Sequence, residues 1–301
     1  MLNVKQQTQK ILEKNDYVTC DYKGCFDIAA KKDVLLLLKT LLNVDSFQKE
    51  QAKNLKIISN NLDAHPIIIG LHTTREKLKT GIVYERFELP TISIKTFKEL
   101  ISNQIFPRIY RDRGGLYVEI DSSLLKETRL KRNLTQRELA EMVGINKKVI
   151  YEHEKKQLRM FLAIAEKLEQ ILDKKLIQPI ELLKKYQEHG HPKDNLEKYV
   201  GKNLEKLGFE TDFVKQAPFD VFVREKSLTL SDVEINKRRI KNRAVNLRNF
   251  INIIKKPAVF ITEKSKDENI LGIPIIERKD LEELERNDFI KITKRVEYEA
   301  I

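Results

Sequence analysis

Cysteine is scarce in this sequence of 301 residues, which has only Cys20 and Cys25. Their separation across a predicted turn fits neither a zinc knuckle nor a disulfide framework, so a reducing, cytoplasmic compartment is expected. Long apolar runs are missing as well, because stretches such as residues 34–38 and 67–69 are far too short to span a bilayer. The first ten residues are polar, and we therefore expect neither secretion nor membrane insertion.

The sequence also lacks the short motifs of common enzyme classes. It has no Gly-rich phosphate loop, no G-x-S-x-G segment and no Cys/His pair at a plausible spacing. His189 and His191 lie in the predicted linker HGHPKDN, and two histidines are too few for a metal site. We expect no enzymatic activity, no cofactor and no bound metal.

Basic residues, in contrast, are abundant. The net charge is +12 and the pI is about 9.4, which favours a polyanionic partner such as nucleic acid, although a basic surface can also be merely solubilising. With 41% hydrophobic and 34% charged residues, the chain has enough apolar material for two or three ordinary domains.

Residues 124–156 predict two short helices joined by a tight turn. Thr135 is placed to cap the first helix and Glu138 to close a capping box, Gly144 supplies the turn, and Asn146 caps the second helix. The apolar residues of the second helix then point back, while Lys147, Lys148 and Tyr151 point outward. This geometry suits a recognition helix in a major groove, but helical pairs of this shape also occur in proteins that bind no DNA.

The residue choices in this segment resemble the helix-turn-helix of the phage-repressor (Cro/C1, or XRE) family. The pattern Thr-Gln-x-x-Leu-Ala is present at residues 135–140, the turn is Gly-Ile-Asn at residues 144–146, and Ile150 and Glu154 match later family positions. His153 and Lys156 depart from the family, which usually has Tyr or Trp and Gly there. The resemblance implies that Gln136 holds a DNA phosphate. In all, seven residues are expected to contact DNA: Gln136, Arg137, Asn146, Lys147, Lys148, Tyr151 and Lys155.

A repeated α/β pattern flanks this central segment. Residues 5–100 predict a helix, a strand near residues 17–21, two adjacent strands at 26–33 and 34–42 with a turn at 31–33, a helix at 47–62, a strand at 66–72, a hairpin at 80–87, and a closing strand and helix. The same landmarks return after residue 197. Asp27 precedes an A-x-N-L motif by 25 residues and Asp220 precedes another by 24, while PIIIG is matched by PAVFI. We interpret this pattern as a duplicated domain, the alternative being two unrelated α/β domains.

Between the first copy and the helical pair, residues 104–120 predict a β-hairpin with a turn at residues 112–115. Arg108, Arg111 and Arg113 are placed to touch DNA beside the helices, but a solvated hairpin that only spaces the domains is the equal alternative. After residue 156 we expect two more helices, at residues 160–172 and 179–187, which gives the central module about five helices.

Each copy resembles the restriction-endonuclease-like fold, in particular its Mrr-like and resolvase-like members. Active members carry an Asp and then Glu/Asp-x-Lys on the next strand, so that two carboxylates hold a divalent metal. The first copy has Asp27 and Lys39, but the middle position is Leu37, which cannot ligate magnesium. The second copy has Asp220, with Leu230 at the middle position and Asp232 where the lysine would fall. Both copies therefore predict the nuclease fold without nuclease chemistry.

The second copy also contains a basic helix, predicted at about residues 236–254. No acidic residue occurs between residues 235 and 262, and apolar residues at helical spacing leave the cations outward. This face either contacts DNA phosphates or is a solvated face that pairs with the acidic tract at residues 277–285. The candidate phosphate contacts are Lys237, Arg238, Arg239, Lys241, Arg243 and Arg248.

The whole layout resembles an archaeal family labelled as helix-turn-helix transcriptional regulatory proteins, which implies DNA-bound regulation. The sequence thus predicts a central five-helix Cro/C1-type helix-turn-helix between two duplicated restriction-endonuclease-like α/β domains. The expected domains are residues 1–103, a hairpin linker at 104–120, the DNA-binding module at 121–190 and the second copy at 191–301. We expect a regulator that binds double-stranded DNA as a homodimer. The alternatives are a metal-dependent nuclease or restriction-linked protein, and a non-specific chromatin or nucleic-acid scaffold.

Overall fold

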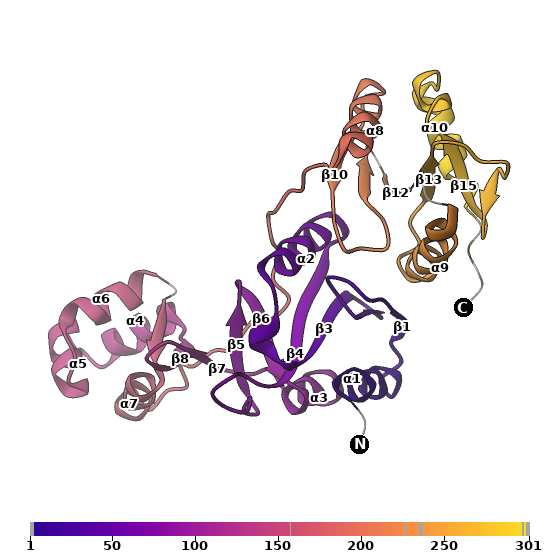
Figure 1. Cartoon of the computed structure of the whole chain (residues 1–301). Helices are drawn as coiled ribbons and strands as arrows, with labels where there is room; N and C mark the ends of the chain where they lie inside the picture. The colour runs from indigo at the N-terminus through magenta and orange to yellow at the C-terminus, as the bar shows by residue number, and fades with distance from the viewer. Residues whose placement is uncertain (1–2, 157, 226, 235–236, 297, 299–301) are drawn as a thin grey trace. The chain divides into compact units, whose positions relative to one another are not determined.

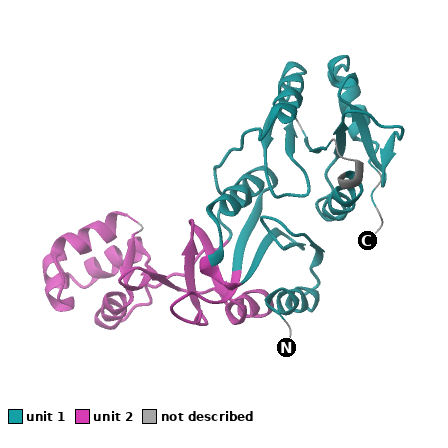
Figure 2. Cartoon of the chain, in the orientation of Figure 1, with its two compact units in different colours: residues 1–41, 46–68, 183–301 teal, residues 42–45, 69–182 magenta. Residues whose placement is uncertain are grey.

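The structure, a computed structural model of the chain, describes residues 3–156, 158–225, 227–234, 237–296 and 298 (Figure 1). It is a mixed α/β protein with ten α-helices among the described residues. The chain divides into two compact units (Figure 2). Unit 1 contains residues 1–41, 46–68 and 183–301, and unit 2 contains residues 42–45 and 69–182. The domain boundaries expected from the sequence stay a prediction.

The N-terminal part of unit 1 forms as the hydrophobic pattern predicted. Strands β1, β2 and β3 are antiparallel neighbours, and the sheet order continues to β4. Residues 35–38 and 67–69 are buried because helices and apolar side chains cover both faces of these strands. The elements are α1 (Val4–Glu13), β1 (Val18–Asp21), β2 (Ile28–Lys31), β3 (Leu35–Asn43), α2 (Lys49–Leu62) and β4 (Ala64–His72).

The C-terminal part of unit 1 repeats this arrangement. Its strands run in the order β10-β11-β12-β13-β15-β14, so β10 to β13 follow the order of β1 to β4. Strands β10, β11 and β12 are antiparallel neighbours, as β1, β2 and β3 are, and β13 pairs in parallel with β12. The elements are α8 (Asn195–Lys206), β10 (Glu210–Phe213), β11 (Val221–Arg224), β12 (Leu228–Val233), α9 (Lys237–Ile254), β13 (Ala258–Thr262), β14 (Asn269–Ile270), β15 (Ile273–Glu277) and α10 (Arg286–Thr293).

The strand register confirms the residue matching on which the predicted repeat was based. Asp27 donates its backbone N–H to the carbonyl of Leu38 at 2.8 Å, and Asp220 donates to the carbonyl of Ser231 at 3.0 Å. Asp27 and Asp220 therefore occupy the same place in their sheets. The next residue of the neighbouring strand is Lys39 in one copy and Asp232 in the other.

The two halves of unit 1 pack against each other through α9, which contacts β1 and β2. The ring of Phe250 on α9 lies 5.7 Å from that of Phe26 and 5.8 Å from that of Phe219, measured between centroids. Cys25 donates its backbone N–H to the carbonyl of Gln216 at 2.8 Å. A Cβ atom at Gly24 would lie 2.1 Å from that same carbonyl oxygen, so the close approach of the halves requires glycine there.

Unit 2 combines the end of the first sheet with a helical module. Its strand order is β4-β6-β5-β7-β8-β9, and the helices bury residues such as Leu139, Ile150 and Leu168. Its further elements are β5 (Ile82–Arg86), β6 (Leu89–Ser93), α3 (Ile94–Asn103), β7 (Ile109–Asp112), β8 (Gly115–Glu119), α4 (Ser122–Lys131), α5 (Gln136–Val143), α6 (Lys147–Lys155), β9 (Arg159–Phe161) and α7 (Leu162–Leu172).

The predicted hairpin is confirmed as β7 and β8, but it is no solvated spacer. Strand β7 pairs in parallel with β5, and β8 pairs with β9, a short strand that the sequence analysis did not predict. Tyr110 and Val118 are fully buried in this sheet. The hairpin is therefore a packed part of unit 2.

The predicted helix at residues 179–187 is wrong, because the structure has neither helix nor strand in this segment. Gln178 donates its backbone N–H to Glu119 at 2.9 Å, and Ile180 donates to Pro107 at 2.8 Å. These bonds to backbone acceptors elsewhere in unit 2 replace the hydrogen bonds that a helix would make. Ile180 and Leu182 are both buried, at a two-residue spacing that does not fit a helix. The described part of residues 121–190 thus has four helices rather than five. None of the described helices is long and apolar enough to cross a membrane.

Candidate nucleic-acid interface and carboxylate clusters

Local capping builds the helical pair α5–α6, as the sequence predicted. Thr135 Oγ1 accepts from the backbone N–H of Glu138 at 3.1 Å, and Glu138 Oε2 accepts from that of Thr135 at 2.6 Å. Gly144 ends α5 with a φ of 81°, in the left-handed region that favours glycine. Asn146 Oδ1 then accepts from Lys148 N at 2.8 Å and starts α6.

We expect Thr135→Ala to lower the free energy of unfolding by about 1 kcal/mol, because it removes the side-chain acceptor for the first turn of α5. Thr135→Ser keeps the acceptor and is the matched control. Urea denaturation measures both variants. Equal stabilities for the serine and alanine variants would contradict a capping role.

A buried ion pair holds α4, α5 and α6 together. Arg129 Nε lies 2.5 Å from Glu154 Oε1 and Arg129 Nη2 lies 3.0 Å from Oε2, and the two side chains are only 7% and 3% exposed. Gln136 Nε2 donates to Glu154 Oε2 at 2.7 Å. The side chain of Gln136, a predicted phosphate contact, is thus bound to Glu154. Arg129 was missed in the sequence analysis because its partner lies 25 residues away.

With α6 held by the Arg129–Glu154 ion pair, one face of this helix remains exposed and basic. Lys147, Lys148, Tyr151 and Lys155 are all exposed, and Lys155 Nζ donates to the hydroxyl of Tyr151 and lies 4.4 Å from the centre of its ring. Among the residues that the structure describes, Lys147 and Lys148 form no ion pair. The neighbouring predicted contacts are also exposed: Asn146 at the N-cap, and Arg137, which pairs with Glu141 at 2.9 Å.

The two departures from the repressor pattern change packing rather than this face. His153 is 7% exposed and packs inward, and burial lowers its pKa, which keeps the imidazole neutral. Lys156 ends α6 in an extended conformation with φ −134° and ψ 142°. The helix therefore ends without the left-handed residue that glycine commonly supplies.

In the first copy of the repeat, Asp27 is hydrogen-bonded to residues of the neighbouring strand β3. Asp27 Oδ1 accepts from Lys39 Nζ at 2.9 Å, and Oδ2 accepts from the backbone N–H and the hydroxyl of Thr40 at 2.7 and 2.9 Å. Lys39 Nζ also donates to the carbonyl of Gly24. Leu37, at the middle position, is fully buried.

In the second copy, cations bridge a buried group of carboxylates. Arg243 on α9 donates through Nη2 to Asp220 Oδ2 at 2.7 Å and through Nε to both oxygens of Asp232 at 2.8 Å. Lys193 Nζ lies 2.9 Å from the other oxygen of Asp220 and 2.5 Å from Glu197 Oε1. The three acidic side chains are at most 5% exposed.

Burial dominates the electrostatics of this group. It raises the pKa of Asp232 well above its ordinary value, with a further contribution from the charge of Asp220, while Arg243 opposes the shift. Burial also raises the pKa of Glu197, against the lowering effect of Lys193. Two cations thus face three buried carboxylates, and both cationic side chains reach the surface, with exposed fractions of 26% for Arg243 and 38% for Lys193.

Neither copy fits a divalent metal ion. The first has a leucine where the second carboxylate is needed, and the oxygens of Asp27 already accept from Lys39 and Thr40. In the second, the guanidinium of Arg243 lies between the two carboxylates. Among the described residues, no three His, Cys, Asp or Glu side chains are placed so that they could hold a metal ion together.

The basic helix α9 is confirmed, but its cations do not share one outward face. Ala244, Leu247 and Ile251 are buried as predicted, Lys241 is exposed and Arg248 is half-buried. Arg243, expected among the phosphate contacts, instead turns inward to the carboxylates. The side chains of three more candidates lie outside the described residues: Lys237, Arg238 and Arg239.

Sequence reasoning missed this role of Arg243, although a signal was available. The repeat replaces Lys39 by Asp232, which reverses the charge at a buried position. A buried carboxylate pair requires a nearby cation. Arg243 directly precedes the A-x-N-L motif on the helix that follows this strand, so it was the candidate within reach.

Comparisons with known proteins place these observations in a family context. A family model described as a PD-(D/E)XK superfamily domain matches residues 2–107. Similar relatives, each named "Putative HTH-type transcriptional regulatory protein", occur in several archaea. The relative from Thermococcus kodakarensis is 34% identical over 89% of this chain and 86% of its own length. That from Pyrococcus furiosus is 33% identical over 87% and 88%, and that from Methanobrevibacter smithii is 33% identical over 98% of both chains. No solved structure matches the chain.

Proposed function

Because this chain belongs to the archaeal family of HTH-type transcriptional regulatory proteins, we propose that it is a sequence-specific regulator that binds double-stranded DNA through α5 and α6. The observation that supports this proposal most directly is the exposed basic face of α6. Lys147, Lys148 and Tyr151 lie on a helix whose position is set by the buried Arg129–Glu154 pair. A short helix held in this way is suited to enter a major groove as the second helix of a Cro/C1-type pair.

In this proposal the seven residues take the roles that the repressor resemblance implies. Lys147, Lys148 and Tyr151 read the groove, and Asn146 and Lys155 lie at the two ends of the same helix. Gln136 and Arg137 contact the backbone at the start of α5, where the helix N-terminus favours a phosphate. Rotation of the Gln136 amide away from Glu154 accompanies that contact.

We further propose that the protein acts as a homodimer. One module per chain reads one half-site, and repressor-type modules bind two half-sites about one helical turn apart. The flanking α/β regions, at residues 1–103 and 191–301 around the module at 121–190, serve as dimerisation or sensing platforms. Restriction-endonuclease-like architecture in the second copy is supported by its matching strand order.

Selection of duplexes from a random DNA pool at about 150 mM salt tests the proposed function. The wild-type protein is expected to enrich a near-palindromic site with two half-sites. Equal binding to all duplexes, unaffected by Lys147→Ala, would instead support the non-specific scaffold.

The PD-(D/E)XK match at residues 2–107 keeps a metal-dependent nuclease as the second candidate function. Because Leu37 and Arg243 occupy positions that a metal site needs, we expect no magnesium-dependent cleavage of plasmid DNA by the wild-type protein. Incubation with supercoiled plasmid and Mg²⁺ or Mn²⁺ measures nicking directly. Nicking that is abolished by Asp27→Asn or Asp220→Asn would establish the nuclease and overturn this expectation.

A further inference from the structure

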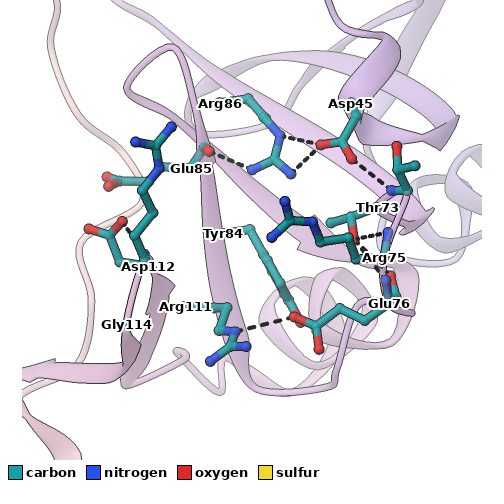
Figure 3. A pocket seen from close by; sticks show the side chains of 12 residues that line it. Asp45, Thr73, Arg75, Glu76, Tyr84, Glu85, Arg86, Arg111, Asp112 and Gly114 are labelled. Carbon is teal, nitrogen blue, oxygen red and sulfur yellow. Dashed lines mark hydrogen bonds and ion pairs between the residues drawn. The ribbon is translucent and has the colours of Figure 1, made fainter.

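A cavity of about 790 Å³ lies in unit 2, on the face of strands β5 and β7 (Figure 3). Strands β5 and β7 are parallel, with Tyr84 beside Arg111. Since residues two apart on a strand share a face, Arg86 projects on the same side as Tyr84. The loop after β4 contributes Arg75, and the turn after β7 contributes Arg113. Four arginines thus line one cavity.

Most of the carboxylates around this cavity are already paired. Asp45 accepts from Arg86 Nε at 2.9 Å and from the backbone N–H of Thr74 at 2.7 Å. Glu76 accepts from Arg111 Nε at 3.2 Å. Glu85 accepts from the two terminal nitrogens of Arg159 at 2.7 and 2.8 Å.

Two guanidinium groups remain without such a partner. Within the described residues, the side chains of Arg75 and Arg113 make no hydrogen bond or ion pair, and both are exposed. The remaining carboxylate, Asp112, accepts from the backbone N–H of Arg113 at 2.6 Å and lies 3.9 Å from Arg159. The lining itself has four arginines and four carboxylates, and Arg86 and Arg111 are the two lining arginines that form ion pairs among the described residues, with Asp45 and Glu76.

We propose that this cavity binds a phosphate group through Arg75 and Arg113, with Arg86 and Arg111 beside them. The planar guanidinium fork matches phosphate oxygens with paired hydrogen bonds, which a lysine ammonium does not provide. The volume lies within the roughly 300–1,000 Å³ of small-molecule sites, so a phosphorylated metabolite of mononucleotide size fits. In Figure 3 Arg86 is turned to Asp45 and Arg111 to Glu76, whereas no dashed line joins the guanidinium of Arg75 to a neighbour.

The position of the cavity connects it to the helical module of the same unit. Arg113 lies in the turn between β7 and β8, and its carbonyl accepts from the hydroxyl of Tyr117 at 3.3 Å. The ring of Tyr117 lies 4.4 Å from that of Phe161, measured between centroids, at the end of β9, which follows α6 closely in the chain. The phosphate comes either from a free metabolite or from the DNA backbone, and the site chemistry is the same in both cases.

Titration calorimetry of the full chain with inorganic phosphate and with AMP tests the site. The variant Arg75→Ala/Arg113→Ala is expected to bind the probe roughly tenfold more weakly for each arginine removed. The matched control is Lys95→Ala/Lys98→Ala, which removes two exposed cations of α3 in unit 2 outside the cavity. All four residues are exposed, so circular dichroism is expected to show that both variants fold.

A second titration, with a duplex of random sequence, separates the two sources of phosphate. Weaker AMP binding in the cavity variant alone, with unchanged duplex affinity, identifies a free metabolite. A lower duplex affinity in the cavity variant than in the control, without binding of either free probe, identifies the DNA backbone. If the cavity and control variants behave alike with every probe, the cavity is no phosphate site and the proposal is overturned.

Discussion

Replacement of Arg243 by alanine is expected to lower the free energy of unfolding by about 3–5 kcal/mol, because it leaves buried carboxylates without their cation. Asp232 is fully buried and Asp220 is 3% exposed, so both carboxylates depend on the guanidinium for charge compensation. Arg243 lies on α9, and this helix also packs on β1 and β2. If the substitution weakens the packing of α9, both halves of unit 1 are therefore destabilised. Denaturation in urea, followed by circular dichroism, measures the change.

Three comparisons make this result specific. Lys241→Ala, two residues away on an exposed position of the same helix, is expected to change stability by less than about 0.5 kcal/mol. Arg243→Met/Asp232→Leu removes both partners and is expected to recover much of the loss. Because burial raises the pKa of Asp232, the loss of stability in Arg243→Ala is expected to shrink as the pH is lowered, since protonation of Asp232 removes the uncompensated charge. An Arg243→Ala variant as stable as Lys241→Ala would show that the bridge contributes little.

Lys147→Ala/Lys148→Ala is expected to weaken binding to the selected DNA site by about 100-fold or more. Each lysine that contacts a base contributes about 1–3 kcal/mol of discrimination, and each that neutralises a phosphate contributes about 0.9 to the slope of log K against log salt. Fluorescence anisotropy at several salt concentrations separates these contributions. A loss of affinity with an unchanged salt slope indicates base contacts, whereas a slope reduced by about 1.8 indicates that both lysines contact phosphates.

The matched control is Lys174→Ala/Lys175→Ala, another exposed pair of adjacent lysines in unit 2. It changes the net charge equally but lies after α7, away from the face of α6. We expect the control to retain nearly all of its specific affinity. If both pairs weaken binding alike, the effect is one of net charge, and α6 is not the reading helix.

Prediction from the sequence succeeded where the deciding interactions are local. The caps at Thr135 and Asn146 and the left-handed Gly144 involve residues at most four apart, so composition and spacing specify them. The buried stripe of α9 follows from helical periodicity in the same way.

Prediction failed where a distant partner decided the outcome. Residues 179–187 carry a helical signal, but Ile180 and Gln178 bind the backbone of residues about 60–70 positions earlier. Strand β9 has only three residues and exists because β8 offers it a pairing edge. Arg243 was assigned to the outward face because helical periodicity assigns residues to faces but does not identify what each face contacts.

By itself, the sequence determined the helical pair, the duplicated α/β pattern and the loss of the second metal-binding carboxylate in the first copy, because each depends on residue type at a fixed short spacing. Only the tertiary structure decided that a guanidinium bridges the carboxylates of the second copy, that Arg129 pairs with Glu154, and that four arginines meet at one cavity. Each of these contacts joins separate helices, strands or loops of the chain. Their electrostatic strength depends on burial, which is set only when the sheets and helices pack.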